Sequence, residues 1–188
     1  MPRAPIGIAI LTATAGLLAG CASSPTVYGA LPQSTSGART PSSIQCVPYA
    51  REHSGVKLYG DAWTWWNAAK GKYPRESSPR PGAVLVLQGY AGPKSGHVAV
   101  VRALAGVREI RVDHANWLDD GAIYLDDPVA DVSAANDWSE VRVWNVETGA
   151  WGGRIYPVAG FIGPAERTDL IAQANIDGAI DLATGEGQ

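Results

Sequence analysis

HVAVVR at residues 97–102 and EIRVDHANW at residues 109–117 decide the fold of this chain. The first run is rich in valine, and the second alternates apolar with polar residues, as half-buried strands do. A turn at Ala105-Gly106 separates the two runs, and the connection is too short to hold a crossover helix. The runs are therefore predicted to pair as an antiparallel hairpin.

The hairpin is predicted to gather polar side chains on its core-facing side. Alternation puts His114 and Asn116 on the apolar face of the second strand, and Asp113 on the opposite face. His97 lies on the apolar face of the first strand. If these faces form one side of the sheet, His97 is opposite or diagonal to His114 or Asn116, with Cβ atoms about 5 Å apart or slightly more. A half-buried imidazole beside a polar partner is expected of an oriented general base.

Helical patterns precede the hairpin, and strands continue after it. Residues 45–53 form the first helical pattern, and residues 61–70 form a second that puts Trp63 and Trp66 together on a predicted core face. Further strands are predicted at 83–87, 140–146 and 158–162. Helices that lead and strands that follow predict an α+β fold, with N-terminal helices packed on a small antiparallel β-sheet.

Cys46 is one of only two cysteines, and Pro48 fixes where it lies. Proline fits only the first turn of a helix, because it lacks an N–H and clashes with a preceding turn. Cys46 is thus predicted at a helix start, where free N–H groups and partial positive charge lower a thiol pKa and stabilise an oxyanion. The alternative is an inert buried thiol, the common state of a free cysteine.

The N-terminus has the pattern of an export signal. Residues 1–20 contain Arg3 and an apolar stretch that is short for a bilayer span, which needs about 20 apolar residues. The stretch ends in Leu18-Ala19-Gly20-Cys21, which resembles the bacterial lipobox, so Cys21 is predicted to carry a lipid after cleavage. Ordinary signal cleavage, with Cys21 lost, is the alternative. Lipidation leaves Cys46 without a disulfide partner.

The rest of the chain divides into a tether, a domain and a tail. Residues 21–40 are rich in small and polar residues and are predicted to form a flexible tether. Ala22 replaces the aspartate that retains many lipoproteins at the inner membrane, so the resemblance implies an outer-membrane anchor facing the periplasm. Residues 41–163 are predicted to form one domain, and 164–188 a tail with room for a short helix. The chain has no basic stripe, so no nucleic-acid partner is predicted.

The order of motifs resembles that of a CHAP domain, a cysteine- and histidine-dependent amidohydrolase or peptidase distantly related to papain. The resemblance is carried by Gln45 through Arg51, a helix with Ala62 and Trp66, Pro81-Gly82, Gly96 through Val101, and His114 through Trp117. It implies a papain-like fold, with Cys46 as the nucleophile and His97 as the base that later protonates the leaving amine. It implies no cofactor and no metal.

The chain departs from the family pattern beside the predicted base. Many members carry a Glu two residues before an Asn-Trp or Asn-Tyr pair; here position 114 is His, while Asn116 is kept. Either His114 or Asn116 is therefore predicted to orient His97, as an amide does in papain-like enzymes. Gln45 is predicted to assist the oxyanion hole.

The resemblance implies cleavage of amide bonds in peptidoglycan, next to muramic acid or within the stem peptides, through a thioester on Cys46. Stem peptides, and the membrane through the lipid, are the predicted partners. One alternative is a catalytically weak or inactive module that binds cell-wall peptides or a partner protein. Others are a zinc site made by Cys46, His97 and His114, and an amidase for small molecules. The aspartate-rich segment from Leu118 to Trp138 is interpreted as a candidate occluding loop.

Overall fold

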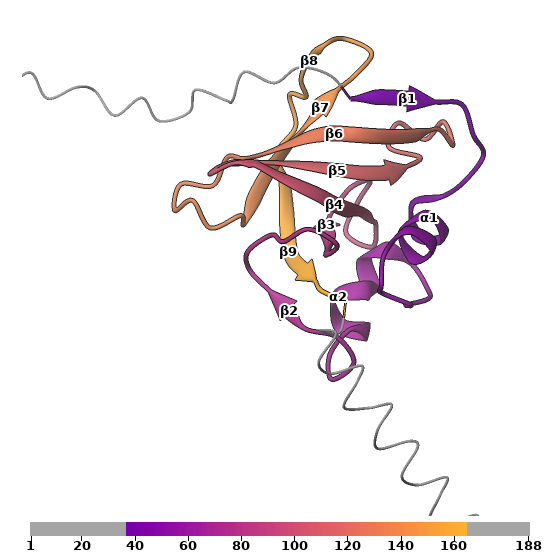
Figure 1. Ribbon diagram of the computed structural model, residues 1–188, viewed down its shortest axis with the longest axis vertical. Helices are drawn as coiled ribbons and strands as arrows, with labels where there is room; N and C mark the ends of the chain where they lie inside the picture. Colours follow the sequence, from indigo (N-terminus) through magenta and orange to yellow (C-terminus); the bar gives the residue numbers. More distant parts are fainter. Residues whose placement is uncertain (1–36, 165–188) are drawn as a thin grey trace, which may run out of the picture.

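The computed structural model describes residues 37–164, which form nine strands and three short helical segments (Figure 1). In chain order they are β1 (Ala38–Thr40), α1 (Cys46–His53), the 3-10 helix η1 (Ala62–Thr64), α2 (Trp65–Ala68), β2 (Arg75–Glu76), β3 (Val84–Gln88), β4 (Gly96–Gly106), β5 (Glu109–Ala115), β6 (Ile123–Asp131), β7 (Glu140–Asn145), β8 (Ala150–Trp151) and β9 (Tyr156–Ile162).

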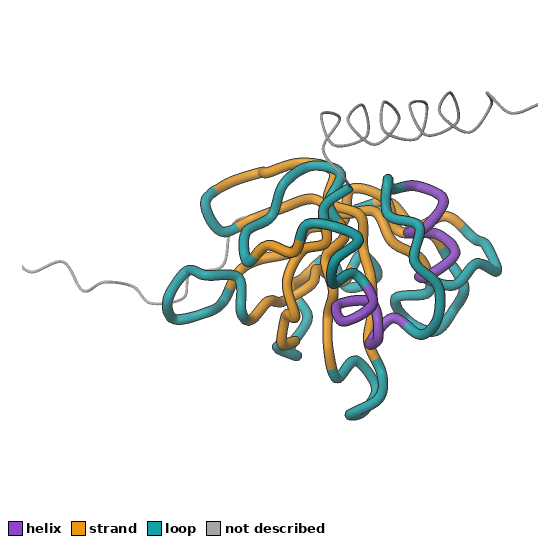
Figure 2. Tube along the Cα trace, turned by 90° about the horizontal axis from the view of Figure 1, so that it is seen from below, coloured by secondary structure: helices purple, strands orange, loops and turns teal. Residues whose placement is uncertain are grey.

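Six of the strands close into an antiparallel barrel in the order β6-β5-β4-β3-β9-β7, with β7 pairing back onto β6. Closure leaves no long open edge, because each barrel strand has a neighbour on both sides over part of its length. The short strands extend the barrel wall: β1 pairs with β6, β2 with β9, and β8 with β7. Figure 2 shows the helical segments gathered on one side of the strands.

The predicted fold class needs correction, although its antiparallel pairing is right. The sheet is not small, and the helices are too short to make an α+β fold with a substantial helical layer; the fold is mainly β. Two causes explain the difference. The pattern at 61–70 yields a 3-10 turn and a four-residue helix, and the segment interpreted as a loop contains β6, one of the longest strands.

Strand β3 separates two apolar clusters. Leu85 and Leu87 belong to the cluster that fills the barrel, while Val84 and Val86 belong to the cluster beneath the helices. All four side chains are at most 1% exposed, as the continuous apolar run predicted. Burying one such side chain stabilises the fold by about 1.5–3 kcal/mol.

The helices pack on the outer face of β3 and β4 through small and aromatic residues. Ala50 of α1 and Trp65 of α2 are fully buried in this cluster, beside Val98 of β4. The predicted core face of Trp63 and Trp66 is right only in part: Trp66 is partly buried and packs against this cluster, whereas Trp63 does not belong to it and Trp65 takes the fully buried position. The change from a 3-10 turn to an α-helix at Trp65 breaks the helical spacing on which that prediction relied.

The predicted hairpin is confirmed by strands β4 and β5. Val101 is paired with Val112, and β-bulges shift the register beyond them, towards the turn. Gly96 begins β4 because no side chain fits there: a Cβ at this position would lie 2.6 Å from the Trp63 backbone nitrogen. The tight contact between η1 and the start of β4 fixes the backbone of the next residue, His97.

A strand of the domain lies before the predicted domain boundary. Residues 38–40 were predicted to end the tether, but they form β1 and pair with residues 123–125 of β6. The predicted signal at 1–20, Cys21 and all of the predicted tail except Pro164 lie outside the described residues. Among residues 37–164, none of the helices is long and apolar enough to cross a membrane.

Candidate active site

Cys46 is the first residue of α1, as Pro48 predicted. Gln45 is the N-cap, with extended backbone, and its side chain makes no capping hydrogen bond. The Cys46 side chain is half-buried and packs against the apolar cluster beneath the helices. It also lies against the backbone of Val98, the residue that follows His97 in β4. The nucleophile and base predicted from the sequence are therefore brought to the same place from α1 and β4.

The environment of the Cys46 thiol differs from the one predicted. Burial raises the pKa of this thiol, and backbone hydrogen bonds from Val98 and Val47 offset that effect only in part. The helix start was predicted to lower it. Desolvation outweighs the helix start because the side chain packs among apolar residues rather than facing water. Cys46 is accordingly a neutral thiol at neutral pH.

His97 is the first member of a buried hydrogen-bonded series. His97 Nε2 lies 2.9 Å from His114 Nδ1, and His114 Nε2 lies 3.0 Å from Asp127 Oδ2. The side chains of these three residues are 2%, 1% and 0% exposed. The two imidazole rings are nearly perpendicular, with an interplanar angle of 86°. Of the two partners predicted for His97, the structure puts His114 against it.

Asp127 was not anticipated from the sequence. It lies in β6, where its Cα is paired with that of Val112, while Tyr124 is paired with His114. Between these two pairs β6 has two residues where β5 has one, and one of the two, Asp126, has a left-handed backbone with φ of 52°. This bulge places Asp127 diagonal to His114. The run Asp126-Asp127-Pro128 is typical of a turn, so the sequence signal favoured a loop here.

Aromatic rings enclose the histidine pair. Trp117 lies edge-on to His97, with ring centroids 4.8 Å apart, and Tyr124 lies 5.3 Å from His114. Tyr90 stands beside His97 at 5.4 Å and donates its hydroxyl hydrogen to the Trp117 carbonyl. Burial raises the pKa of Tyr90 to about 12, so this hydroxyl stays protonated. Water is kept away from the imidazoles, which strengthens their electrostatic interactions.

The pKa of His97 is held well below 6.5, first by burial and then by the electrostatic effect of the neighbouring His114 ring. His97 is therefore a neutral base at neutral pH. Together with the raised pKa of Cys46, this makes the resting pair a neutral thiol and a neutral imidazole. Chemistry at such a pair begins with proton transfer from sulfur to nitrogen, and not from a preformed thiolate.

Asn116 contacts Gln45 instead of His97. Its Nδ2 donates to Gln45 Oε1 over 2.8 Å, and its Oδ1 accepts from the Gly121 backbone N–H over 2.7 Å. Asn116 has a left-handed backbone with φ of 57°, a conformation that asparagine tolerates better than most residues. Because Gln45 Oε1 is occupied as an acceptor, its amide nitrogen remains as the donor end of the side chain.

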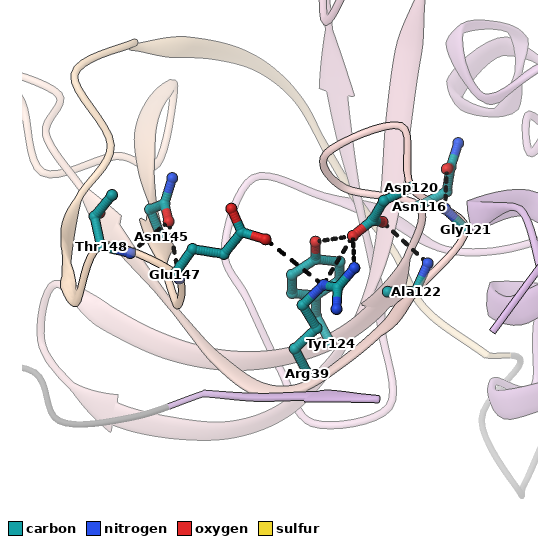
Figure 3. Close-up of polar contacts among 9 residues, drawn as sticks. All are labelled: Arg39, Asn116, Asp120, Gly121, Ala122, Tyr124, Asn145, Glu147 and Thr148. Carbon is teal, nitrogen blue, oxygen red and sulfur yellow. Dashed lines mark hydrogen bonds and ion pairs between the residues drawn. The ribbon is translucent and has the colours of Figure 1, made fainter. Parts of the chain in front are cut away.

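The loop that carries Asn116 is tied to β1 and to the turn after β7 (Figure 3). The Asp120 carboxylate accepts hydrogen bonds from Tyr124 Oη at 2.7 Å and from Arg39 Nη2 at 2.6 Å. Glu147 adds a longer ion pair to Arg39 at 3.8 Å. These contacts fix residues 116–122 beside Gln45.

The remaining polar candidates lie away from the series. Asp113 forms an ion pair with Arg102 at 3.0 Å, in keeping with its predicted position on the opposite face. His53 is exposed and stacks on Tyr49, with ring centroids 4.0 Å apart. Within residues 37–164, no group of three His, Cys, Asp or Glu side chains is suited to a metal ion.

A neutral thiol at a helix start, against the strand that carries a buried, hydrogen-bonded imidazole, is the arrangement expected of a cysteine- and histidine-dependent hydrolase site. The comparison with protein families agrees: residues 35–116 match the family model of the CHAP domain. This part of the chain is therefore similar to the CHAP domain, a family of cysteine- and histidine-dependent amidohydrolases. The match includes Cys46, His97 and His114 but ends before Asp127. No curated protein matches the chain.

Proposed function

We propose that this protein is a peptidoglycan amide hydrolase, an amidase or endopeptidase that acts through Cys46 and His97. The CHAP match supports a role of this kind. The observation that carries the proposal is the neutral, buried His97, which is hydrogen-bonded to His114. The Cys46 side chain lies against the backbone of Val98, the next residue of β4. A base in its neutral form can take the thiol proton at neutral pH.

The first half-reaction is acylation. His97 takes the proton of the Cys46 thiol as the sulfur attacks the amide carbonyl carbon, which gives a tetrahedral oxyanion. The intermediate collapses when His97 passes the proton to the leaving nitrogen, so that the C–N bond breaks and a thioester to Cys46 remains. The amine product carries away the proton that came from sulfur.

Two kinds of donor are available for the oxyanion. One is the backbone N–H at the start of α1, where Val47 and Cys46 itself face the sulfur. The other is the side-chain nitrogen of Gln45, whose oxygen is held by Asn116.

In the second half-reaction, His97 takes a proton from water as the water attacks the thioester. The proton then returns to sulfur, and the carboxylic acid is released.

The location proposed for this activity is the envelope. The pattern at Leu18-Ala19-Gly20-Cys21 supports lipidation of Cys21. A tether between Cys21 and the domain gives the site reach from an outer-membrane anchor to the wall in the periplasm. Globomycin, which blocks lipoprotein signal cleavage, tests this part: the unprocessed precursor should accumulate in treated cells, and Cys21→Ala should remove lipid labelling.

The activity is tested by digestion of purified peptidoglycan and mass analysis of the new ends. Wild type is expected to release soluble fragments with one new amine and one new carboxylate per cut. Cys46→Ala and His97→Ala are expected to release none. His53→Ala is the matched control, because His53 is exposed and lies outside the buried series. Release of the same fragments by Cys46→Ala would contradict the proposal.

The second candidate function is a module that binds cell-wall peptides without turnover. The raised pKa of the Cys46 thiol favours it, since a protonated thiol is a weak nucleophile. Sedimentation with insoluble wall separates the two functions. A wild type that sediments with the wall and releases nothing supports the binding module, whereas release that depends on Cys46 supports the hydrolase.

A further inference from the structure

The series that begins at His97 ends in a carboxylate. Asp127 is fully buried, and its Oδ2 lies 3.0 Å from His114 Nε2. We propose that Asp127 is a positioning residue of the hydrolase: acting through His114, it holds the proton of His97 on Nε2 and leaves Nδ1 free to take the thiol proton. This inference rests on the proposed function.

The direction of the hydrogen bonds follows from the carboxylate. An ionised carboxylate only accepts, so the hydrogen between Asp127 and His114 belongs to His114 Nε2. A neutral imidazole carries one hydrogen, which leaves His114 Nδ1 as an acceptor. The hydrogen of the 2.9 Å contact must then come from His97 Nε2. The other ring nitrogen of His97, Nδ1, is consequently bare, as a general base requires.

Without Asp127 this direction is not fixed. His114 is equally able to carry its hydrogen on Nδ1 and donate it to His97 Nε2. His97 would then hold its own hydrogen on Nδ1, and that nitrogen could not accept the thiol proton. The carboxylate thus selects between a competent and a blocked arrangement of the same two rings.

The carboxylate also supplies charge when the reaction needs it. Proton transfer from Cys46 makes His97 an imidazolium in a site lined by aromatic rings, where an isolated cation is poorly solvated. Asp127 provides a negative charge one imidazole away. Burial raises the pKa of the Asp127 carboxyl, and the hydrogen bond from His114 and the nearby Arg111 of β5 counter this effect by favouring the ionised form, whereas Asp126 of β6 opposes it.

A purely structural role does not account for Asp127 well. Its other oxygen, Oδ1, has no hydrogen-bond partner among the described residues, and the main chain of Gly37 covers it, because a Cβ there would lie 2.8 Å away. Asp131 of the same strand differs. It is also buried, and its Oδ2 likewise accepts no hydrogen bond among the described residues, but Arg108 lies 3.9 Å from that oxygen, and its Oδ1 accepts from both the backbone and the side chain of Ser133. Asp127 is thus held against one partner, the imidazole of His114.

The test begins with wild type, whose histidines are labelled with ¹⁵N so that NMR reports which ring nitrogen carries hydrogen. At about pH 7.5 His97 and His114 are both expected to carry it on Nε2. In Asp127→Ala a population with hydrogen on Nδ1 is expected in both rings. The turnover number is expected to fall by about 10- to 100-fold with KM little changed, the size of loss known for carboxylates that orient a histidine from the outer shell of a metal site.

Two further variants separate positioning from folding. Asp127→Asn keeps an oxygen that can accept from His114 but removes the charge, so the hydrogens should stay on Nε2 while turnover still falls. Asp131→Asn removes the charge of a buried aspartate that touches no imidazole, and it should change neither the hydrogens nor turnover. The inference is overturned if folded Asp127→Ala keeps the wild-type hydrogens and turnover, or if Asp131→Asn loses as much turnover as Asp127→Asn.

Failure of the hydrolase proposal is distinguishable from failure of this inference. The rate at which iodoacetamide alkylates Cys46 reports on the base without any wall substrate. If wild type digests no peptidoglycan, yet its ring hydrogens and alkylation rate respond to Asp127→Ala, the positioning role stands and the proposed substrate is wrong. If wild type digests peptidoglycan and Asp127→Ala changes nothing, the hydrolase stands and the positioning role is wrong.

Discussion

Asn116 Nδ2 lies 2.8 Å from Gln45 Oε1, so the loop after β5 holds the residue that precedes Cys46. The side-chain nitrogen of Gln45 stays available as a donor, and Gln45 is the N-cap residue of α1, directly before Cys46. Asn116, which was predicted as one of two residues that could orient His97, thus has a different partner. Its contact supports a part in oxyanion stabilisation through Gln45.

Asn116→Ala is expected to lower the turnover number by about 10²-fold, the lower end of the loss seen when an oxyanion donor is removed. The reason is that Gln45, exposed and no longer held, spends most of its time in other rotamers. Gln45→Ala should lose about as much, and the double variant should lose little more, because both changes remove one interaction. Steady-state kinetics on a soluble peptidoglycan fragment measures this.

Asp119→Ala is the control for that series. Asp119 lies in the same loop and meets Asn116 Nδ2 only at 3.4 Å, so its loss should leave turnover nearly unchanged. Additive losses for Asn116→Ala and Gln45→Ala would show that the two amides act separately, which would contradict the role given to this contact.

The unfolding free energy is expected to depend on pH through His97. Its pKa in the folded protein lies well below 6.5, so the folded state binds fewer protons than the unfolded state does. This contribution to stability is present above pH 6.5 and is lost as pH falls below it, by about 1.4 kcal/mol per pH unit. Denaturant titrations at several pH values between about 5 and 7.5 measure the slope.

His97→Gln is expected to flatten that slope, whereas His53→Gln, which changes an exposed histidine, should keep it. Asp127 changes the unfolding free energy in the opposite direction, because burial raises the pKa of this carboxyl. Its contribution to stability is present at acid pH and is lost as pH rises through the raised pKa. Asp127→Asn should therefore steepen the acid loss. An unchanged slope in His97→Gln would mean that another group governs the acid response.

Much of the site could be predicted from the sequence, because the signals for it lie within short segments of the chain. Pro48 fixed the start of α1, and strand alternation brought His97 to His114. The rest depended on features that alternation does not record. Asp127 is placed by a bulge at Asp126, in the strand β6 that also contains Pro128. The barrel accepts this proline because β1 pairs with β6 before Pro128 and β7 pairs with β6 after it. Burial of Cys46 arises from packing between α1 and β4, which no local pattern reports.

The tryptophans also show that local spacing does not report tertiary packing, and they give a prediction about stability. Trp65→Ala is expected to destabilise the fold by about 3–5 kcal/mol, because Trp65 is fully buried between the helices and the barrel wall. Trp63→Ala, which changes a partly exposed ring two residues away, is the matched control and should cost distinctly less. Chemical denaturation with tryptophan-independent detection, such as circular dichroism, measures both. Equal losses would place Trp63 in the core, as the helical spacing predicted.

Gly96→Ala tests whether the contact between η1 and β4 positions the base. A Cβ at Gly96 would lie 2.6 Å from the Trp63 backbone nitrogen and 2.8 Å from the Leu87 carbonyl oxygen. Backbone atoms on both sides cannot move as a side chain can, so the strand must shift, at a cost of about 1–3 kcal/mol. His97 follows in the chain, and its 2.9 Å contact with His114 should lengthen. Turnover is therefore expected to fall by more than the unfolded fraction accounts for. Gly153→Ala is the control, since a Cβ there meets nothing within 4 Å; a stable, fully active Gly96→Ala would show that this contact does not position His97.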